Sequence, residues 1–446
     1  MARRYWNEEI ETIGPAARRR LENERLAEQI AYNWAASPFY RAKLEGAGLT
    51  PRRIRAVEDL ALVPFTEKTE IAESQRTGSL LGATRCAPVD RIVRIQATGG
   101  TTGQPMRIGL TRQDVEDYGE MGARALWAMG CRPGDVVFEC MNYNLYAGGV
   151  SDHMTFETVG AATIPFGVGQ SERLLQMMAA LEDELCLWST PSYAMRLAGL
   201  ARDKDIDPRT LRLRKGFFSG EAGMQVPGFR ERIEATWGMV ARDQYGTGEL
   251  GLHSGECEHR NGVHFGGVGF AVAELIDPDT GDVLPFDDGR QGEVVYTSIR
   301  REACPLMRMR SHDLMQVFTE TCACGRTSFR LRILGRSDDM FIVKGVNVFP
   351  QSVQAVVLTL APRLNGEFRV VLDRPPPIDY AVPVEVEVAR DVPEAHHADL
   401  AAELVERLRK ELNFTAAARL TEAGSIASEA KTRRVVRTYR ADERAP

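Results

Sequence analysis

The residues most suited to chemistry stand at positions 98–103, directly after an apolar segment at 92–95 that predicts a strand. They form a glycine- and threonine-rich loop: Thr98, Gly99, Gly100, Thr101, Thr102 and Gly103. Glycines let a turn expose its backbone N–H groups, and threonine hydroxyls add donors and acceptors, so the loop suits a polyphosphate. An ordinary surface turn is the alternative. Because Gln104 and Pro105 follow Gly103, the loop is not a Walker A motif, and it also lacks the G-x-G-x-x-G spacing of a dinucleotide fingerprint.

Three further polar motifs follow in order along the chain. Ser219, Gly220 and Glu221 end an apolar run, and 243–249 reads Asp-Gln-Tyr-Gly-Thr-Gly-Glu. In the second motif a tyrosine offers a stacking face, and a carboxylate is a hard oxygen ligand for Mg²⁺. The third motif, 308–314, is a charged strand that contains Asp313. Taken singly, each motif also fits a polar turn or a strand end with internal ion pairs.

Taken together, these motifs resemble the adenylate-forming superfamily, and most closely its phenylacetate–CoA ligase family, over about residues 30–437. The resemblance implies that the loop at 98–103 binds the phosphates of ATP. It implies a catalytic, Mg²⁺-binding role for Glu249 and a ribose ligand in Asp313. The other implied nucleotide contacts are Ser219, Gly220, Glu221, Asp243, Tyr245, Gly246, Thr247 and Arg336. Gly248 departs from the family pattern, which has a hydroxyl residue there; Thr247 is a candidate substitute.

Two motifs near the C-terminus resemble the parts of this family that move during catalysis. The stretch 335–350 resembles the junction between a large and a small domain, which implies a hinge at Asp338 and a CoA contact at Gly345. The stretch 428–435 implies that Lys431 is the catalytic lysine of adenylation, since an ammonium group can neutralise charge developing on the phosphate. Ala430 replaces the usual glycine, and an exposed basic tail is the alternative interpretation.

The acid itself is predicted from the segment 138–149, which resembles the aryl pocket of the family. Tyr143 and Tyr146 are the candidate substrate contacts, and Asn142 and Asn144 would make the pocket more polar. We therefore predict an AMP-forming ligase that joins an aromatic acid such as phenylacetate or indoleacetate to CoA, using ATP and Mg²⁺. Two alternatives stay open: transfer of the acyl group to an amine or carrier protein, and a catalytically weakened nucleotide-binding protein.

Three of the eight cysteines differ from the others because histidines or a second cysteine stand close to them. Cys257, His264, Cys322 and Cys324 offer three sulfurs and one nitrogen, which fits a structural zinc site. Some members of the resembled family have the same Cys-x₆-His spacing and a similar Cys-x-Cys. His259 is the alternative ligand, and three unrelated reduced thiols are the alternative interpretation.

Length and pattern predict an α/β protein of two domains, with a large domain at 1–335 and a small mobile α+β domain at 336–446. Apolar runs and helical stretches alternate from 131 to 220, which predicts parallel βαβ units, and a β-rich part follows at 263–318. The net charge of −6 argues against nucleic-acid binding. We find no apolar run long enough for a membrane span, and we expect a cytoplasmic protein. A homodimer is compatible with these expectations.

Overall fold

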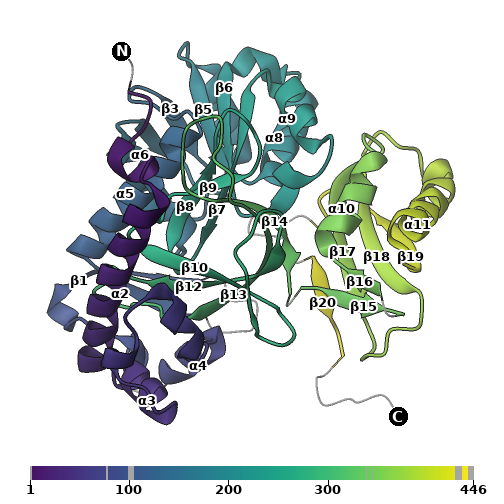
Figure 1. The fold of residues 1–446 in the computed structure, drawn as a ribbon. Coiled ribbons are helices and arrows are strands. Elements are labelled where there is room, and N and C mark those ends of the chain that lie inside the picture. Colours follow the sequence, from purple (N-terminus) through teal and green to yellow (C-terminus); the bar gives the residue numbers. More distant parts are fainter. Residues whose placement is uncertain are drawn as a thin grey trace.

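A twelve-stranded mixed sheet forms the framework of the larger domain in the computed structural model, which describes residues 3–76, 79–98, 105–337, 339–344, 346–426 and 434–439 (Figure 1). The strand order is β11-β10-β12-β13-β14-β9-β8-β7-β6-β5-β3-β4. Strands β3 to β7 run parallel to one another, and the strands from β8 onward join antiparallel. The strands are β3 (Val136–Glu139), β4 (Ala162–Pro165), β5 (Leu185–Ser189), β6 (Leu213–Phe218), β7 (Val240–Thr247), β8 (Gly251–Glu256), β9 (Val263–Phe265), β10 (Ala271–Ile276), β11 (Val283–Leu284), β12 (Gln291–Ser298), β13 (Met309–Phe318) and β14 (Arg330–Arg336).

Helices cover both faces of the parallel part of this sheet. Successive side chains of a strand point to opposite faces. Val137 and Phe217 accordingly belong to the core beneath α5 and α6, and the next residues, Phe138 and Phe218, to the core beneath α7, α8 and α9. A parallel sheet buried on both faces explains why these strands are almost wholly apolar in sequence. The helices are α5 (Arg112–Ala128), α6 (Ala147–Val159), α7 (Ser171–Ala179), α8 (Pro191–Asp203) and α9 (Phe229–Trp237).

The N-terminal quarter of the chain packs against the β-rich end of the sheet, where Figure 1 shows its helices in purple. Leu26 and Ile30 of α2 share a core with Val272 of β10. This part also holds a separate antiparallel pair of strands just before and after the phosphate-loop motif. Its elements are α1 (Glu8–Glu11), α2 (Pro15–Ala36), α3 (Pro38–Gly46), α4 (Lys68–Ser74), β1 (Ile92–Ala97) and β2 (Arg107–Thr111).

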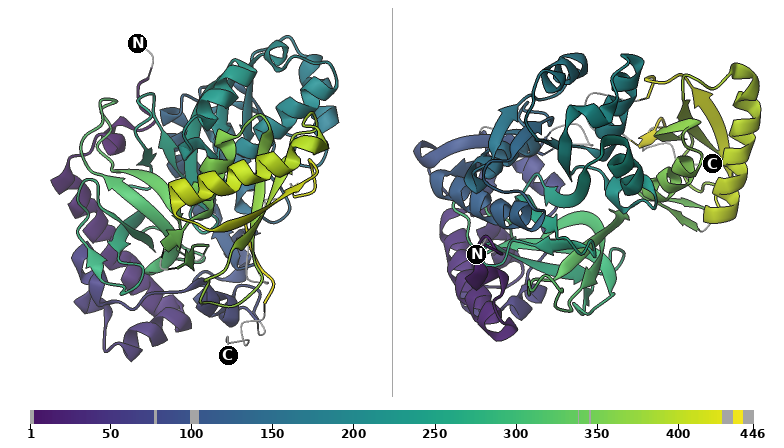
Figure 2. Two further views of the ribbon diagram at one scale, coloured as in Figure 1. Left: turned by 90° about the vertical axis from the view of Figure 1, so that its right-hand side faces the viewer. Right: turned by 90° about the horizontal axis from the view of Figure 1, so that it is seen from above.

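The C-terminal domain has its own core, built on a four-stranded sheet in the order β19-β18-β17-β20. It lies beside β14 and at one end of the molecule when seen from above (Figures 1 and 2). The predicted boundary at 335/336 stays a prediction, although the large sheet continues through Arg336. The elements are β15 (Phe341–Val343), β16 (Val346–Val348), α10 (Pro350–Thr359), β17 (Leu364–Leu372), β18 (Val382–Val388), α11 (His397–Leu412), β19 (Ala416–Thr421) and β20 (Val435–Arg437).

These observations confirm the predicted α/β class and the alternation of strands and helices from 131 to 220. Helix α5 begins after Thr111, because the Thr111 side chain caps it by accepting a hydrogen bond from the Asp114 N–H at 3.2 Å. Among the described residues, no helix is both long and apolar enough to cross a membrane.

Candidate nucleotide and acyl-acid site

The predicted nucleotide motifs meet at the carboxyl edge of the parallel strands. In a parallel sheet these ends lie side by side, and ligands bind in the crevice beyond them. The turn at 219–221 follows β6, and the Ser219 N–H donates to the Ser189 carbonyl at the end of β5, at 3.1 Å. Asp243 lies on β7 in register with Phe218 of β6. Motifs far apart in sequence therefore share one edge.

Three residues from three separate motifs form one cluster. The Tyr245 hydroxyl donates to Asp313 Oδ2 at 2.6 Å, and the Arg336 guanidinium lies 2.8 Å from Asp313 Oδ1. The register of β13 against β14 creates this contact, since Asp313 and Arg336 stand directly opposite each other. Burial, and then the charge of Asp313, raise the pKa of Tyr245 well above its usual value. Both oxygens proposed to hold the ribose are thus preorganised by neighbouring side chains.

Asp243 lies in an unusually charged part of the interior. Its carboxylate accepts a hydrogen bond from the Gln225 amide, and nearby Glu256 is paired with Arg230 at 2.8 Å. Burial, and then the charge of Glu256, raise the pKa of Asp243 to about 7. Glu221 is held differently, because it accepts from the Ser192 hydroxyl at 2.7 Å at the start of α8. An acidic group is favourable there, so Glu221 has a local structural partner.

Glu249, the predicted Mg²⁺ ligand, has a partner that the sequence did not indicate. Its buried carboxylate lies 2.8 Å from the ammonium group of Lys68, the first residue of α4. Burial opposes both charges, but the attraction between them outweighs it; the pKa of Glu249 is lowered and that of Lys68 is raised. Tyr118 fixes the backbone by donating to the Glu249 carbonyl at 2.6 Å. The charge of Glu249 is thus balanced by Lys68 in this structure, and its role as a Mg²⁺ ligand stays a prediction.

The close packing around Gly248 explains its departure from the family pattern. A Cβ atom added there would lie 2.9 Å from Thr98 Cγ2 and 3.1 Å from Thr98 Cα, which is too close. Thr98 is the first residue of the phosphate loop, and its N–H donates to the Met106 carbonyl at 3.0 Å. The hydroxyl of Thr247 accepts from the Leu250 N–H at 3.1 Å. The other loop residues, Gly99, Gly100, Thr101, Thr102 and Gly103, lie outside the described residues, as do Asp338, Gly345 and Lys431.

The predicted acid-binding segment lies next to the phosphate-loop strand. The Ala97 N–H donates to the Leu145 carbonyl at 2.8 Å, and the Ser151 hydroxyl donates to the Gln96 side chain at 2.7 Å. The Gln96 amide in turn donates to the Gly248 carbonyl at 3.3 Å. Sequence analysis missed Gln96, which links the segment to the Glu249 motif. The phosphate-loop strand therefore stands between the candidate acid and metal sites.

Tyr143 and Tyr146 differ in their surroundings. Tyr146 is partly exposed, whereas the Tyr143 hydroxyl contacts buried Glu139 and lies 3.1 Å from His153 Nδ1. The Asn142 side-chain oxygen accepts from the Asn144 N–H at 2.9 Å, so it closes a local turn. The contribution of Asn142 and Asn144 to the polarity of the pocket stays a prediction.

The four predicted zinc ligands converge in the interior. Cys257, His264, Cys322 and Cys324 are buried, and their ligand atoms lie within 4.8 Å of one another. The sulfurs of Cys257 and Cys322 are 3.7 Å apart, and Cys324 Sγ lies 3.4 Å from His264 Nε2. A tetrahedral zinc ion would require about 3.8 Å and about 3.5 Å for these separations. The alternative ligand His259 lies outside the cluster, beside Glu258. The donor set therefore fits a structural zinc ion.

Comparison with known proteins identifies the family. The phenylacetate–CoA ligase of Thermus thermophilus is 36% identical over 386 residues, which cover 85% of this chain and 84% of that protein. The enzyme of the same name from Escherichia coli is 30% identical and covers 96% of both chains. The chain belongs to the phenylacetate–CoA ligase family of adenylate-forming enzymes. It is an AMP-forming CoA ligase. Residues 345–439 also match the family of AMP-binding enzyme C-terminal domains.

The ligase is also similar in structure to 2-hydroxyisobutyryl-CoA ligase, at 32% identity over 98% of this chain and 93% of that one. The TM-score is 0.89 against its postadenylation state with R3-HIB-AMP. It is 0.72 against the thioesterification state of the same protein with 2-HIB-AMP and CoA. The arrangement of this ligase is therefore closer to the first state.

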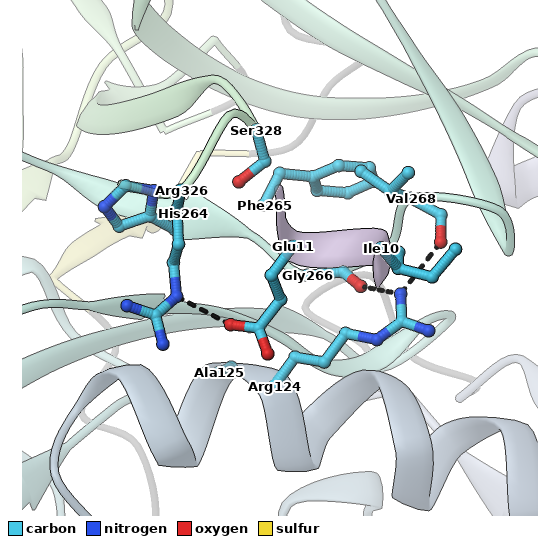
Figure 3. Close-up of a pocket in the computed structure, with 10 residues that line it drawn as sticks. All are labelled: Ile10, Glu11, Arg124, Ala125, His264, Phe265, Gly266, Val268, Arg326 and Ser328. Atoms are coloured by element: carbon cyan, nitrogen blue, oxygen red, sulfur yellow. Dashed lines mark hydrogen bonds and ion pairs between the residues drawn. The ribbon is translucent and has the colours of Figure 1, made fainter. Parts of the chain in front are cut away.

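The N-terminal segment of the ligase packs against the cysteine cluster. The Tyr5 hydroxyl donates to the Cys324 carbonyl at 3.0 Å, and Glu11 pairs with Arg326 at 2.7 Å with both side chains almost fully buried. Figure 3 shows this pair between α1 and the strand that carries His264, lining a small pocket. The cluster thus ties the N-terminal segment to the large domain, which supports a structural role for the predicted metal site.

Proposed function

We propose that the ligase uses ATP to activate an arylacetate, either phenylacetate or indoleacetate, and then transfers the acyl group to CoA. The proposal depends above all on the contacts of β1, which joins the segment at 143–146 through Ala97 and the Glu249 motif through Gln96. One end of the crevice offers a carboxylate for two ribose hydroxyls, and the other offers tyrosine side chains to a flat ring. The phosphate-loop strand lies between them, where the acid carboxylate and the α-phosphate must meet.

In the first half-reaction, the carboxylate of the acid attacks the α-phosphate and pyrophosphate leaves. The residues act mainly by positioning and by electrostatics. Asp313 and Arg336 hold the ribose, Asp243 contacts the adenine amino group, and Lys431 neutralises charge at the reacting oxygens. Glu249 would hold Mg²⁺, which neutralises charge on the triphosphate when it is bound.

In the second half-reaction, the thiol of CoA displaces AMP from the acyl-adenylate. We propose that the small domain rotates about Asp338 and brings Gly345 toward the thioester-forming site. The two TM-scores support this step, because the same relative exists in two arrangements and this chain is closer to one of them. Lys431→Ala should therefore abolish adenylate formation but spare thioester formation from preformed adenylate. Asp338→Pro should do the reverse.

The substrate is tested by measuring kcat/KM for pyrophosphate release with phenylacetate, indoleacetate, benzoate, octanoate and 2-hydroxyisobutyrate. We expect one of the arylacetates to exceed the others by at least about tenfold, or ~1.4 kcal/mol. A preference for 2-hydroxyisobutyrate would contradict the arylacetate assignment and favour the chemistry named for the structural relative. Formation of ADP and phosphate would contradict the ligase mechanism itself.

We also propose that Cys257, His264, Cys322 and Cys324 hold one structural zinc ion. The fit of their separations to a tetrahedron supports this, as does their complete burial. All four positions are filled by protein side chains, so no position remains for a substrate or a reactive water.

A further inference from the structure

A buried acid stands behind the candidate acyl pocket, at a position the proposed reaction leaves unexplained. Glu139 ends β3, has 0% of its surface exposed, and contacts the Tyr143 hydroxyl. The same hydroxyl lies 3.1 Å from Nδ1 of His153 on α6. Nε2 of His153 lies 3.2 Å from Glu157, whose side chain is exposed. These four residues form a continuous chain from the core to the surface.

The chemistry of the four groups links them in order. The Tyr143 hydroxyl donates to Glu139, which leaves its oxygen facing Nδ1 of His153. Nε2 of the same ring faces the Glu157 carboxylate. Burial raises the pKa of Glu139 to about 9, and the hydrogen bond that Glu139 accepts from Tyr143 opposes this rise. The neighbouring Asp152 is also buried, and burial raises its pKa to about 8.

The Tyr143 ring is consequently held at both ends. Its hydroxyl makes both of its hydrogen bonds within the chain of four residues. Its backbone lies directly on α6, where a Cβ atom at Gly149 would come within 2.7 Å of Tyr143 Cα. The ring therefore has little freedom to adjust to an acid of another shape, and preorganisation of this kind favours one geometry.

We propose that Glu139 and His153 are positioning residues that set the acid specificity of the ligase by fixing the Tyr143 ring. This inference rests on the proposed function, since it takes Tyr143 as a wall of the acid pocket. A fixed ring suits a flat aromatic acid, whereas a released ring admits flexible aliphatic chains. Breaking the contacts among these four residues should thus weaken acid binding and acid selectivity without changing KM for ATP.

The test compares Glu139→Leu, Glu139→Gln and Tyr143→Phe by steady-state pyrophosphate release with the best acid of the panel and with octanoate. Glu139→Leu and Tyr143→Phe should each raise KM for the best acid by about tenfold. KM for ATP and kcat should stay within about twofold. Glu139→Gln supplies an amide oxygen that can accept from Tyr143 in the same place, so it should stay within about threefold of the wild type at pH 7.

Two further readouts separate positioning from general damage. The double variant Glu139→Leu/Tyr143→Phe should be no worse than either single variant, because both break the same chain. Glu184→Leu is the matched control: Glu184 stands before β5, is exposed and pairs with Arg214 at 3.0 Å. Glu184→Leu should leave kcat, KM for the acid and KM for ATP unchanged.

Tyr143→Phe provides an independent test if Glu139→Leu fails to fold. It removes only the hydroxyl that contacts Glu139 and His153, so KM for the acid should still rise by about tenfold while KM for ATP stays unchanged.

An unchanged KM for the acid in Tyr143→Phe, or KM for ATP and for the acid rising together, would overturn the proposal. Failure of the proposed function would appear differently, as an inactive arylacetate in the wild-type panel. The positioning test then proceeds on whichever acid is active.

Discussion

Lys68 offers the sharpest test of the electrostatics around Glu249. Lys68→Met keeps much of the length of the side chain but removes the charge that lies 2.8 Å from the Glu249 carboxylate. Removing one partner of a fully buried ion pair costs about 3–5 kcal/mol, because it leaves an uncompensated charge. The Glu249 side chain is 5% exposed but that of Lys68 is 33% exposed, so solvent screens part of the interaction. We therefore expect a loss of about 2 kcal/mol at pH 7.

The pH dependence has a definite sign. The lowered pKa of Glu249 stabilises the fold above its ordinary value of 4.5, and this contribution is lost as the pH falls through the folded pKa. The raised pKa of Lys68 stabilises the fold below 10.5 and is lost as the pH rises through its folded pKa. The difference between wild type and Lys68→Met should thus be greatest between these two values and shrink on either side.

A double-mutant cycle with Glu249→Gln, followed by urea denaturation, measures the coupling. The matched control is Lys204 and Glu172, which lie 3.1 Å apart. Lys204 is 35% exposed, like Lys68, but Glu172 is 62% exposed. The control cycle should give about 0–0.5 kcal/mol, against about 2 kcal/mol for Lys68 and Glu249. Equal coupling in the two cycles would refute the argument that burial of the carboxylate decides the magnitude.

Three further predictions follow from the same geometry. The purified protein should carry about one zinc per chain by elemental analysis. Replacing Cys322 and Cys324 by Ser should lower the metal content and the melting temperature together, whereas the control Cys86→Ser should change neither. An unchanged melting temperature in the Cys322/Cys324 variant would show that these thiols are ordinary core residues. The free energy of unfolding of Asp243→Asn, measured with urea, should exceed that of the wild type at pH 8. This advantage should be about 2–4 kcal/mol larger at pH 8 than at pH 5. The wild type loses stability between its ordinary pKa of 3.8 and its raised pKa of about 7, whereas a parallel pH dependence in the variant would contradict that shift. Gly248→Ser should lower the melting temperature. Adding Thr98→Ser should restore part of the loss, because it removes the methyl group 2.9 Å from the new Cβ. If the single and double variants lose the same amount, that contact is not the cause.

The sequence predicted the site best where motifs end strands. Asp243 lies level with the end of β6, where the turn at 219–221 begins, because the parallel pairing of β6 and β7 places Phe218 opposite Asp243. The motif around Asp313 and the junction motif around Arg336 also predicted residues that do meet. The β13–β14 register that brings them together became visible only in the structure.

The sequence could not predict partners that come from elements without a motif. Lys68 opens α4, and no pattern around it points to Glu249, which is 181 positions away (249 − 68). His153 stands on a helix whose other residues are mostly apolar or small, so its spacing indicates nothing. Asn142 illustrates a different limit. Its residue type suits a ligand, but Asn side chains also close local turns, and its side-chain oxygen does so here, while its place in a polar pocket stays a prediction.

The position of Arg336 bears on how the two half-reactions share one nucleotide site. Arg336 belongs by pairing to β14 of the large sheet, and its contact with Asp313 lies wholly on that side of the proposed hinge at 338. Rotation about residue 338 would therefore leave the candidate ribose contacts intact. Lys431, in contrast, comes after the hinge and would leave the site. In that case AMP stays bound through Asp313 and Arg336, while Lys431 leaves the site and Gly345 approaches it for the reaction with CoA. The division between fixed and moving contacts then coincides with the end of a single strand.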